Sequence, residues 1–270
     1  MPDRLWSRSE GDGPPVVFLH GWMMDHRDEA ATYDAVFAGR GYRRIYLDLP
    51  GMGQSADAAV PDDLDGFADR LTAEIGELTG GEAFLLSGTS AGALLACGIA
   101  ARQPGGLRGL LLRVPLVHGP DAHRDIDPVR PLRAASPDPD AVPADIAGLL
   151  DQPPLIQDRR WTRGLYRKLR ERIVPAMRLA DLARLGPVRT DPARYDLRHD
   201  LAMFDRPALI LAARQDDNVG WRDALSRFAD WPRATLALLD AAGHEFPLDH
   251  QMPLMRALVE DWIDRLEVAP

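Results

Sequence analysis

The 270-residue chain contains a single cysteine, Cys97, so no disulfide can form within it. Secreted proteins that depend on disulfides carry several cysteines, and one buried thiol is more typical of a reducing cytosol. Cys97 stands in a run of alanine and leucine residues, where a small thiol fits a packed core better than a reactive site. We therefore expect a cytoplasmic protein without disulfides.

Long apolar runs and positive charge are also scarce. No stretch of about 18 apolar residues occurs, so the sequence predicts no membrane span. Residues 1–8 lack the apolar core of a signal peptide. The formal net charge is −9, and Lys168 is the only lysine. A negative balance argues against general nucleic-acid binding. We expect a small-molecule partner from the motifs described below, and the oligomeric state stays open.

The chain does contain short apolar runs without alternation, separated by segments with helical spacing. Runs of this kind are typical of strands buried on both faces of a parallel sheet. They lie at residues 16–20, 44–48, 83–87, 107–117, 207–213 and 234–239. The regular succession of strand and helix predicts an α/β fold with a mostly parallel central sheet and helices on both faces.

The composition changes between residues 115 and 200, which hold 12 of the 23 prolines. Helical spacing is found there at 142–150, 158–173 and 175–185, but no clear buried strand. We therefore predict a core formed by residues 1–117 and 201–270, and a helical cap or lid, residues 118–200, inserted between two strands. Such caps shape substrate pockets and exclude water.

The most informative stretch is Gly88-Thr89-Ser90-Ala91-Gly92, which joins a predicted buried strand to a predicted helix. A strand, a tight turn and a helix around Gly-x-Ser-x-Gly form a nucleophile elbow. The turn strains the serine backbone and lifts its hydroxyl above the sheet, and Gly88 and Gly92 leave room for the neighbouring strand and helix. The alternative is an ordinary glycine-serine loop before a helix.

A serine hydroxyl needs a base to become a nucleophile, and the base needs a carboxylate to orient it. Asp216 and His244 follow the last two predicted strands, so both should meet Ser90 at the carboxyl edge of the sheet. The order Ser, Asp, His is the order found with this elbow. Asp217 is expected to be a solvated loop carboxylate, and Asp240 lies too close to His244 along one loop to support its ring.

Acyl transfer also needs backbone N–H groups aimed at the developing oxyanion. One donor is expected from Ala91, directly after the nucleophile, and the other from Trp22, in the loop after the first apolar run. The alternative for that loop is a simple strand-ending turn. Met23 and Met24, beside Trp22, are candidates for the pocket wall. Trp161, Leu165 and Leu169 share helical spacing on a predicted cap helix, and one or more of them is expected to line the pocket.

The predicted helix at 158–173 is rich in arginine: Arg159, Arg160, Arg163, Arg167 and Arg170. Such a cluster could attract an anionic substrate. Arginine interleaved with aspartate and glutamate is more typical of a solvated helix face, and we favour that interpretation.

Four motifs together resemble the α/β-hydrolase superfamily, in its serine-nucleophile, cap-bearing, esterase-like form. They are His20-Gly21-Trp22, Asp48-Leu49-Pro50-Gly51-Met52-Gly53-Gln54-Ser55, Gly88-Thr89-Ser90-Ala91-Gly92, and Arg214-Gln215-Asp216 with Gly243-His244. Asp48 is expected to organise the backbone of its own turn. Ala213 stands where the family often has a glycine three positions before the acid, and Ala93 stands where a second glycine often follows the elbow.

The resemblance implies a serine hydrolase that cleaves a small or medium acyl ester or thioester through an acyl-enzyme intermediate, without a metal or organic cofactor. A serine nucleophile argues against epoxide hydrolases and haloalkane dehalogenases, which resemble this plan but use aspartate. Three alternatives keep the same triad: C–C bond hydrolysis, peptide hydrolysis and a lyase reaction. A fourth is a non-catalytic ligand receptor on the same scaffold. The sequence does not determine the acyl group or the leaving group.

Overall fold

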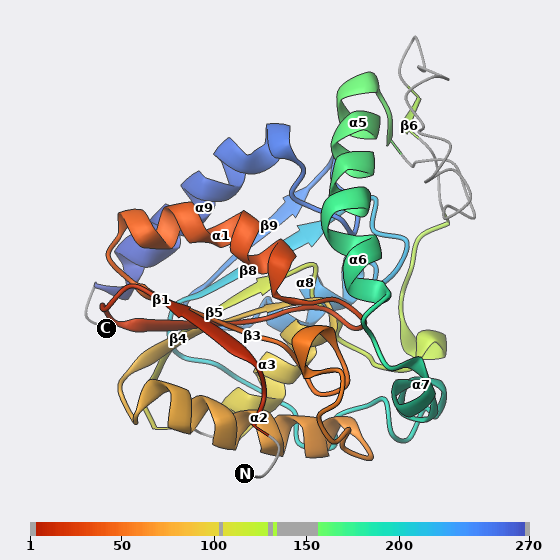
Figure 1. Cartoon of the computed structure of the whole chain (residues 1–270). Helices are drawn as coiled ribbons and strands as arrows, with labels where there is room; N and C mark the ends of the chain where they lie inside the picture. The colour runs from red at the N-terminus through yellow and green to blue at the C-terminus, as the bar shows by residue number, and fades with distance from the viewer. Residues whose placement is uncertain (1–3, 103–104, 129–131, 134–155, 268–270) are drawn as a thin grey trace.

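A seven-stranded sheet forms the centre of the computed structural model, which describes residues 4–102, 105–128, 132–133 and 156–267 (Figure 1). The strands lie in the order β1-β3-β2-β4-β5-β8-β9. β1 is antiparallel to β3, and the other neighbours are parallel. Their bounds are β1 Ser7–Glu10, β2 Pro15–Leu19, β3 Arg43–Leu47, β4 Phe84–Thr89, β5 Leu107–Arg113, β8 Ala208–Ala213 and β9 Ala234–Leu239. The predicted α/β fold is confirmed.

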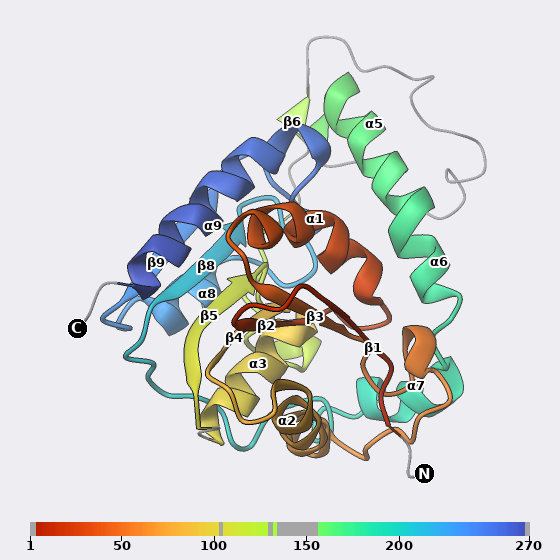
Figure 2. The same ribbon diagram turned by 60° about the vertical axis from the view of Figure 1, so that its left-hand side comes forward.

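Helices cover both faces of the sheet (Figures 1 and 2). α1 (His26–Gly39) and α9 (Met252–Leu266) lie on one face, and α2 (Leu64–Thr79), α3 (Ala91–Ala101) and α8 (Arg222–Phe228) lie on the other. Successive side chains of a strand point to opposite faces. In β2, Val16 and Phe18 therefore join the core beneath α1 and α9, while Val17 and Leu19 join the core beneath α2 and α3. Two covered faces explain why the strand sequences are apolar without alternation.

The segment between β5 and β8 is mainly helical in its described part. It contains η2 (Asp121–His123), β6 (Leu132–Arg133), β7 (Ile156–Gln157), α5 (Arg159–Lys168), η4 (Leu169–Ile173), α6 (Val174–Met177) and α7 (Leu182–Thr190). Figure 1 shows α5 and α6 beside the edge of the sheet toward which β8 and β9 point. The predicted helix at 142–150 lies outside the described residues.

The sequence pattern differs from the structure in two details here. The predicted helix at 158–173 continues into α6 through a π-helical turn, η4. Pro175 lies in the first turn of α6, directly after η4. Proline has no N–H to donate, so regular α-helical bonding is interrupted at this point. β6 and β7 pair through only two residues each, too few to produce a strand pattern in the sequence. No helix in the described ranges is both long enough and apolar enough to cross a bilayer.

A buried arginine at the end of β5 joins several of these elements. Arg113 has 1% of its side chain exposed. Its Nε donates to Thr89 Oγ1 at 3.0 Å, and its Nη1 donates to the carbonyl oxygen of Phe246 at 2.8 Å. Its Nη2 donates to carboxylates in the first turn of α1, Asp28 at 2.8 Å and Glu29 at 2.7 Å. One side chain thus connects β4, α1 and the loop that follows β9.

Burial raises the pKa of the Asp28 and Glu29 carboxyl groups, and the Arg113 guanidinium lowers it. Burial raises the pKa of Asp28, but the adjacent Lys168 and Arg113 outweigh burial and hold that pKa below its usual value. Burial also raises the pKa of Glu29, and Arg113 offsets this only in part. The guanidinium therefore offsets the cost of burying Asp28 and offsets part of the cost of burying Glu29.

Replacing Arg113 by methionine should destabilise the protein strongly, because Asp28 and Glu29 would remain buried without their shared cation. We expect a loss of about 3–5 kcal/mol in the free energy of unfolding, measured by urea denaturation. Arg108→Met is the matched control, since Arg108 lies exposed on the same strand, and it should change stability by no more than about 0.5 kcal/mol. Equal small losses in both variants would show that the buried network contributes little.

Candidate active site

Ser90 lies in the tight turn between β4 and α3, with φ 54° and ψ −121°. A positive φ is rare outside glycine and costs about 1–3 kcal/mol. A Cβ atom at Gly88 would overlap the carbonyl oxygen of Gly92, and one at Gly92 would overlap the carbonyl oxygens of Leu19 and His20. The steric need expected at both glycines is therefore confirmed.

Two other non-glycine residues with positive φ lie beside the same site. Met23, at φ 62°, follows Trp22, and Val114, at φ 40°, follows Arg113. A β-branched residue rarely adopts this conformation. Val114 is held there by its N–H, which donates to the carbonyl oxygen of Leu211 at 2.7 Å. Backbone strain thus gathers at the carboxyl edge of the sheet, a distribution that is common at functional sites.

His244 and Asp216 meet across the ends of β9 and β8. His244 Nδ1 lies 2.8 Å from Asp216 Oδ2, and the Asp216 side chain is fully buried. Asp216 Oδ1 accepts the backbone N–H groups of Asn218 and Val219, each at 2.9 Å. Asp217 is exposed, and the carboxylate that bonds to His244 Nδ1 belongs to the preceding residue, Asp216. The geometry thus agrees with the choice made from the sequence.

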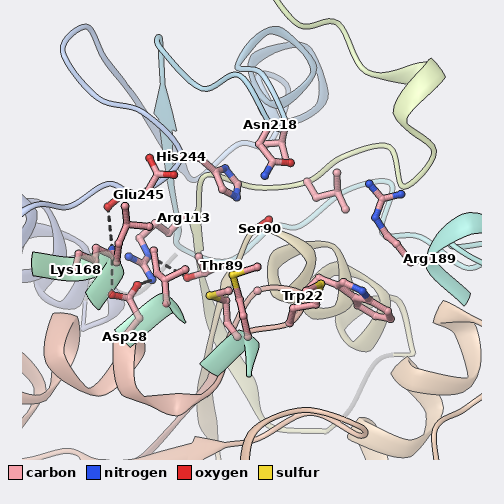
Figure 3. A pocket seen from close by; sticks show the side chains of 18 of the residues that line it. Trp22, Asp28, Thr89, Ser90, Arg113, Lys168, Arg189, Asn218, His244 and Glu245 are labelled. Carbon is pink, nitrogen blue, oxygen red and sulfur yellow. Dashed lines mark hydrogen bonds and ion pairs between the residues drawn. The ribbon is translucent and has the colours of Figure 1, made fainter. Parts of the chain in front are cut away.

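The environment of His244 sets its basicity. Burial lowers the pKa of the imidazole, but the Asp216 carboxylate at Nδ1 outweighs burial, so the net pKa is raised above 6.5. Because Nδ1 donates to Asp216, Nε2 of the neutral ring carries the free lone pair. Figure 3 shows the His244 ring and Ser90 facing the same cavity.

The cavity has a volume of about 330 Å³, and both Ser90 and His244 line it. Much of its wall is apolar: Trp22, Met23, Met24, Leu116, Leu169 and Ile173. Met23 lies where the sequence suggested.

Trp161 and Leu165 do not reach this cavity. They lie in α5, where Trp161 packs edge-on against His250 with ring centroids 4.4 Å apart. The following turn, η4, supplies Leu169, the third candidate on this helix, and Ile173 to the cavity wall. Of the three candidates on this helix, Leu169 lies in the cavity wall and Trp161 and Leu165 do not, because helical spacing identifies the inward face of a helix but not which of its turns lies beside the cavity.

Both expected oxyanion donors lie close to Ser90, one along the chain and one across the cavity. Trp22 lines the cavity, and Ala91 is the first residue of α3. Neither backbone N–H donates to another group within the part of the chain that the structure describes. His20 fixes the loop before Trp22: its Nε2 accepts the N–H of Leu49 at 2.9 Å, so its Nδ1 carries the proton and donates to the carbonyl oxygen of Gly21 at 2.8 Å.

Asp48 has the structural role expected from its position. The carboxylate is fully buried and accepts the backbone N–H groups of His26 and Gln54, each at 2.8 Å. The His26 ring also approaches it, with Nδ1 at 3.0 Å. These bonds hold the turn after β3 in shape.

Lys168 is a site residue that the sequence reasoning missed. Its Nζ donates to the carbonyl oxygen of Glu245 at 2.9 Å and pairs with Asp28 at 3.0 Å, and its side chain is 5% exposed. Burial lowers the pKa of this amine. Lys168 thereby links α5 to the loop that carries His244 (Figure 3). The one feature of the sequence that singled out Lys168 was that it is the only lysine. The rarity of a residue type does not by itself predict that its side chain is buried.

Comparison with known proteins agrees with this architecture. A family model described as the alpha/beta hydrolase family matches residues 16–257. The structure resembles an alpha/beta superfamily hydrolase from Oenococcus oeni PSU-1 with a TM-score of 0.82 and 24% identity, covering 98% of this chain and 97% of that one.

Two curated relatives match over shorter stretches. A 2-succinyl-6-hydroxy-2,4-cyclohexadiene-1-carboxylate synthase from Klebsiella pneumoniae (strain 342) is 40% identical over 101 residues, 37% of each chain. A pimeloyl-[acyl-carrier protein] methyl ester esterase from Vibrio atlanticus (strain LGP32) is 39% identical over 74 residues, 27% of this chain and 28% of the relative. The chain thus matches 37% of the first relative's length and 28% of the second's. The family match spans most of the chain, which therefore belongs to the alpha/beta hydrolase family of enzymes.

Proposed function

We propose that this protein is a serine hydrolase that cleaves small or medium acyl esters or thioesters through an acyl-enzyme intermediate. The observation that carries the proposal is the shared cavity of Ser90 and His244, with Nδ1 of His244 already bonded to a buried Asp216 at 2.8 Å. The largely apolar wall suits an acyl chain. The esterase activity of one relative is consistent with this chemistry.

In the first half-reaction, Ser90 Oγ attacks the substrate carbonyl carbon while His244 Nε2 takes its proton. Negative charge develops on the carbonyl oxygen, and the N–H groups of Trp22 and Ala91 stabilise it. Asp216 holds the ring in the correct tautomer and stabilises the imidazolium. His244 then gives its proton to the departing alcohol or thiol as the C–O or C–S bond breaks, leaving an acyl group on Ser90.

In the second half-reaction, His244 takes a proton from water, and the resulting hydroxide attacks the acyl-enzyme. The same N–H pair stabilises the second oxyanion. Collapse of the intermediate releases the carboxylic acid, and His244 returns the proton to Ser90 Oγ. Each proton removed is returned, so the enzyme is regenerated.

We further propose that residues 118–200 act as a cap over this site. Leu169, Ile173 and Met177 from this segment line the cavity together with Ser90. A cover of this kind excludes bulk water while the acyl-enzyme forms and limits the size of the acyl group. It is also the part of the chain best placed to determine substrate preference.

Ser90→Ala should lower kcat for p-nitrophenyl esters by at least about 10³-fold, because the nucleophile is removed while the oxyanion donors remain. Ser226→Ala, which alters an exposed serine on α8, is the matched control and should retain wild-type activity. Wild-type-like turnover by the Ser90 variant would overturn the mechanism. Absence of turnover by the wild type across esters and thioesters would favour the C–C, peptide, lyase or receptor alternatives.

The pH dependence of kcat/KM should identify His244 as the base. The protonated ring cannot accept a proton, so activity should rise with pH through an apparent pKa above 6.5, the direction in which Asp216 shifts it. Asp216→Asn should lower kcat by about 10⁴-fold, since the ring loses its orienting carboxylate. Asp217→Asn is the control and should stay near wild type; a flat profile between about pH 5 and 8, or the reverse order of the two variants, contradicts these roles.

A further inference from the structure

One end of the catalytic cavity carries an arginine whose hydrogen-bonding capacity is not used up. Arg189, from α7, lines the cavity together with Ser90. Figure 3 shows it on the opposite side of Ser90 from Lys168 and Arg113. Its Nη2 donates to both oxygens of Asp121, at 2.8 and 3.0 Å, and its guanidinium lies 4.7 Å from the centroid of the Tyr195 ring.

This end of the cavity keeps an excess of positive charge. Arg124 also lines the cavity and pairs with the same Asp121 carboxylate at 2.7 Å. Two guanidinium groups therefore share one carboxylate, and that carboxylate is 63% exposed to solvent. Solvent weakens its ability to neutralise them, which leaves a net attraction for an anion at this point.

The two arginines differ in the donors they have left. Arg124 donates to the carbonyl oxygens of His118, Gly119 and Asn218 in addition to its ion pair. The Nε and Nη1 groups of Arg189 donate to no group in the ranges that the structure describes. Its side chain is 34% exposed, so these donors are accessible to a ligand.

The cations on the other side of Ser90 are already occupied. Arg113 donates through Nε, Nη1 and Nη2 to Thr89, Phe246, Asp28 and Glu29. Lys168 donates to two carbonyl oxygens and pairs with Asp28. These two groups stabilise the protein's own carboxylates. Arg189 is the cavity cation best placed to bind an external anion.

We propose that Arg189 is a substrate-binding residue that recognises a carboxylate, so that the preferred substrate is an ester or thioester with a free carboxylate at the end remote from the reacting carbonyl. A guanidinium forms strong charge-assisted hydrogen bonds to a carboxylate. Leu116 and Val219, which also line the cavity, provide apolar contact for the methylene groups of such a substrate. The inference rests on the proposed ester hydrolysis and adds the charge of the substrate to it.

The test compares carboxylated esters with uncharged esters of the same shape. Monoethyl succinate, glutarate and adipate are each paired with the ethyl ester of the corresponding primary monoamide, and hydrolysis is followed by pH-stat titration. A second series, ω-acetoxy carboxylates paired with their amides, places the carboxylate on the alcohol side. At one chain length or more, we expect kcat/KM to favour the carboxylate over the amide by at least about tenfold.

Arg189→Gln removes the charge and keeps most of the side-chain length. It should lower kcat/KM for the favoured carboxylate by about 10- to 100-fold and change kcat/KM for the paired amide by no more than about threefold. Arg194→Gln is the matched control. Arg194 is an exposed arginine paired with Asp191 and does not contribute to the described lining of this cavity, so its variant should keep the preference.

Binding to the Ser90→Ala variant, measured by calorimetry with the favoured half-ester, separates recognition from turnover and should weaken when Arg189→Gln is added. Hydrolysis of all esters without a carboxylate preference in either series would overturn the inference and leave the proposed function intact. A preference that Arg189→Gln does not reduce would also overturn it. Hydrolysis of no ester by the wild type would instead overturn the proposed function.

Discussion

The arrangement of the site depends on the buried guanidinium of Arg113. Ser90 and His244 lie on separate loops, and loops are the parts of a fold that the sheet positions least tightly. Arg113 bonds to Thr89, the residue before Ser90, and to the carbonyl oxygen of Phe246, two residues after His244. It therefore fixes the two loops to one strand end and, through Asp28 and Glu29, to α1.

A buried ion cluster is a costly way to join loops, because each charge must leave water. Apolar packing would join the loops without the cost of removing charges from water, but it would not fix the distances and angles between them. Hydrogen bonds from a planar guanidinium fix distances and angles at several carbonyl and carboxylate oxygens at once. Lys168 extends the cluster to α5 through Asp28 and Glu245, so α5 and the loop of His244 are positioned by the same charges.

The parts of this structure that the sequence could predict are those with local causes. Strands buried on both faces produce apolar runs, and the tight turn at Ser90 requires small residues at Gly88 and Gly92. The pairing of His244 with Asp216 followed because parallel strands bring their carboxyl ends to one edge. In each case a short stretch of sequence carries the geometric requirement.

The parts that could not be predicted depend on contacts between distant segments. Arg113 lies in a run predicted to be buried, but the partners of its charge, Asp28 and Glu29, follow only from where α1 packs. Lys168 lies in a charged helix that resembles a solvated surface, and its burial follows from where α1 and the loop after β9 pack. Trp161, Leu165 and Leu169 share the helical spacing of an inward face, yet of these three Leu169 lines the cavity, together with Ile173. The presence of Arg189 in the cavity wall likewise depends on how α7 packs against the rest of the protein.

The most direct test of the account is to find where a covalent adduct forms. The protein is treated with a fluorophosphonate, which reacts with an activated serine, and the modified residue is located by peptide mass spectrometry. We expect one adduct on Ser90, formed rapidly in the wild type and slowly in His244→Ala, because the hydroxyl is activated only when the imidazole can take its proton. An unmodified Ser90, or labelling at the same rate in the His244 variant, would contradict it.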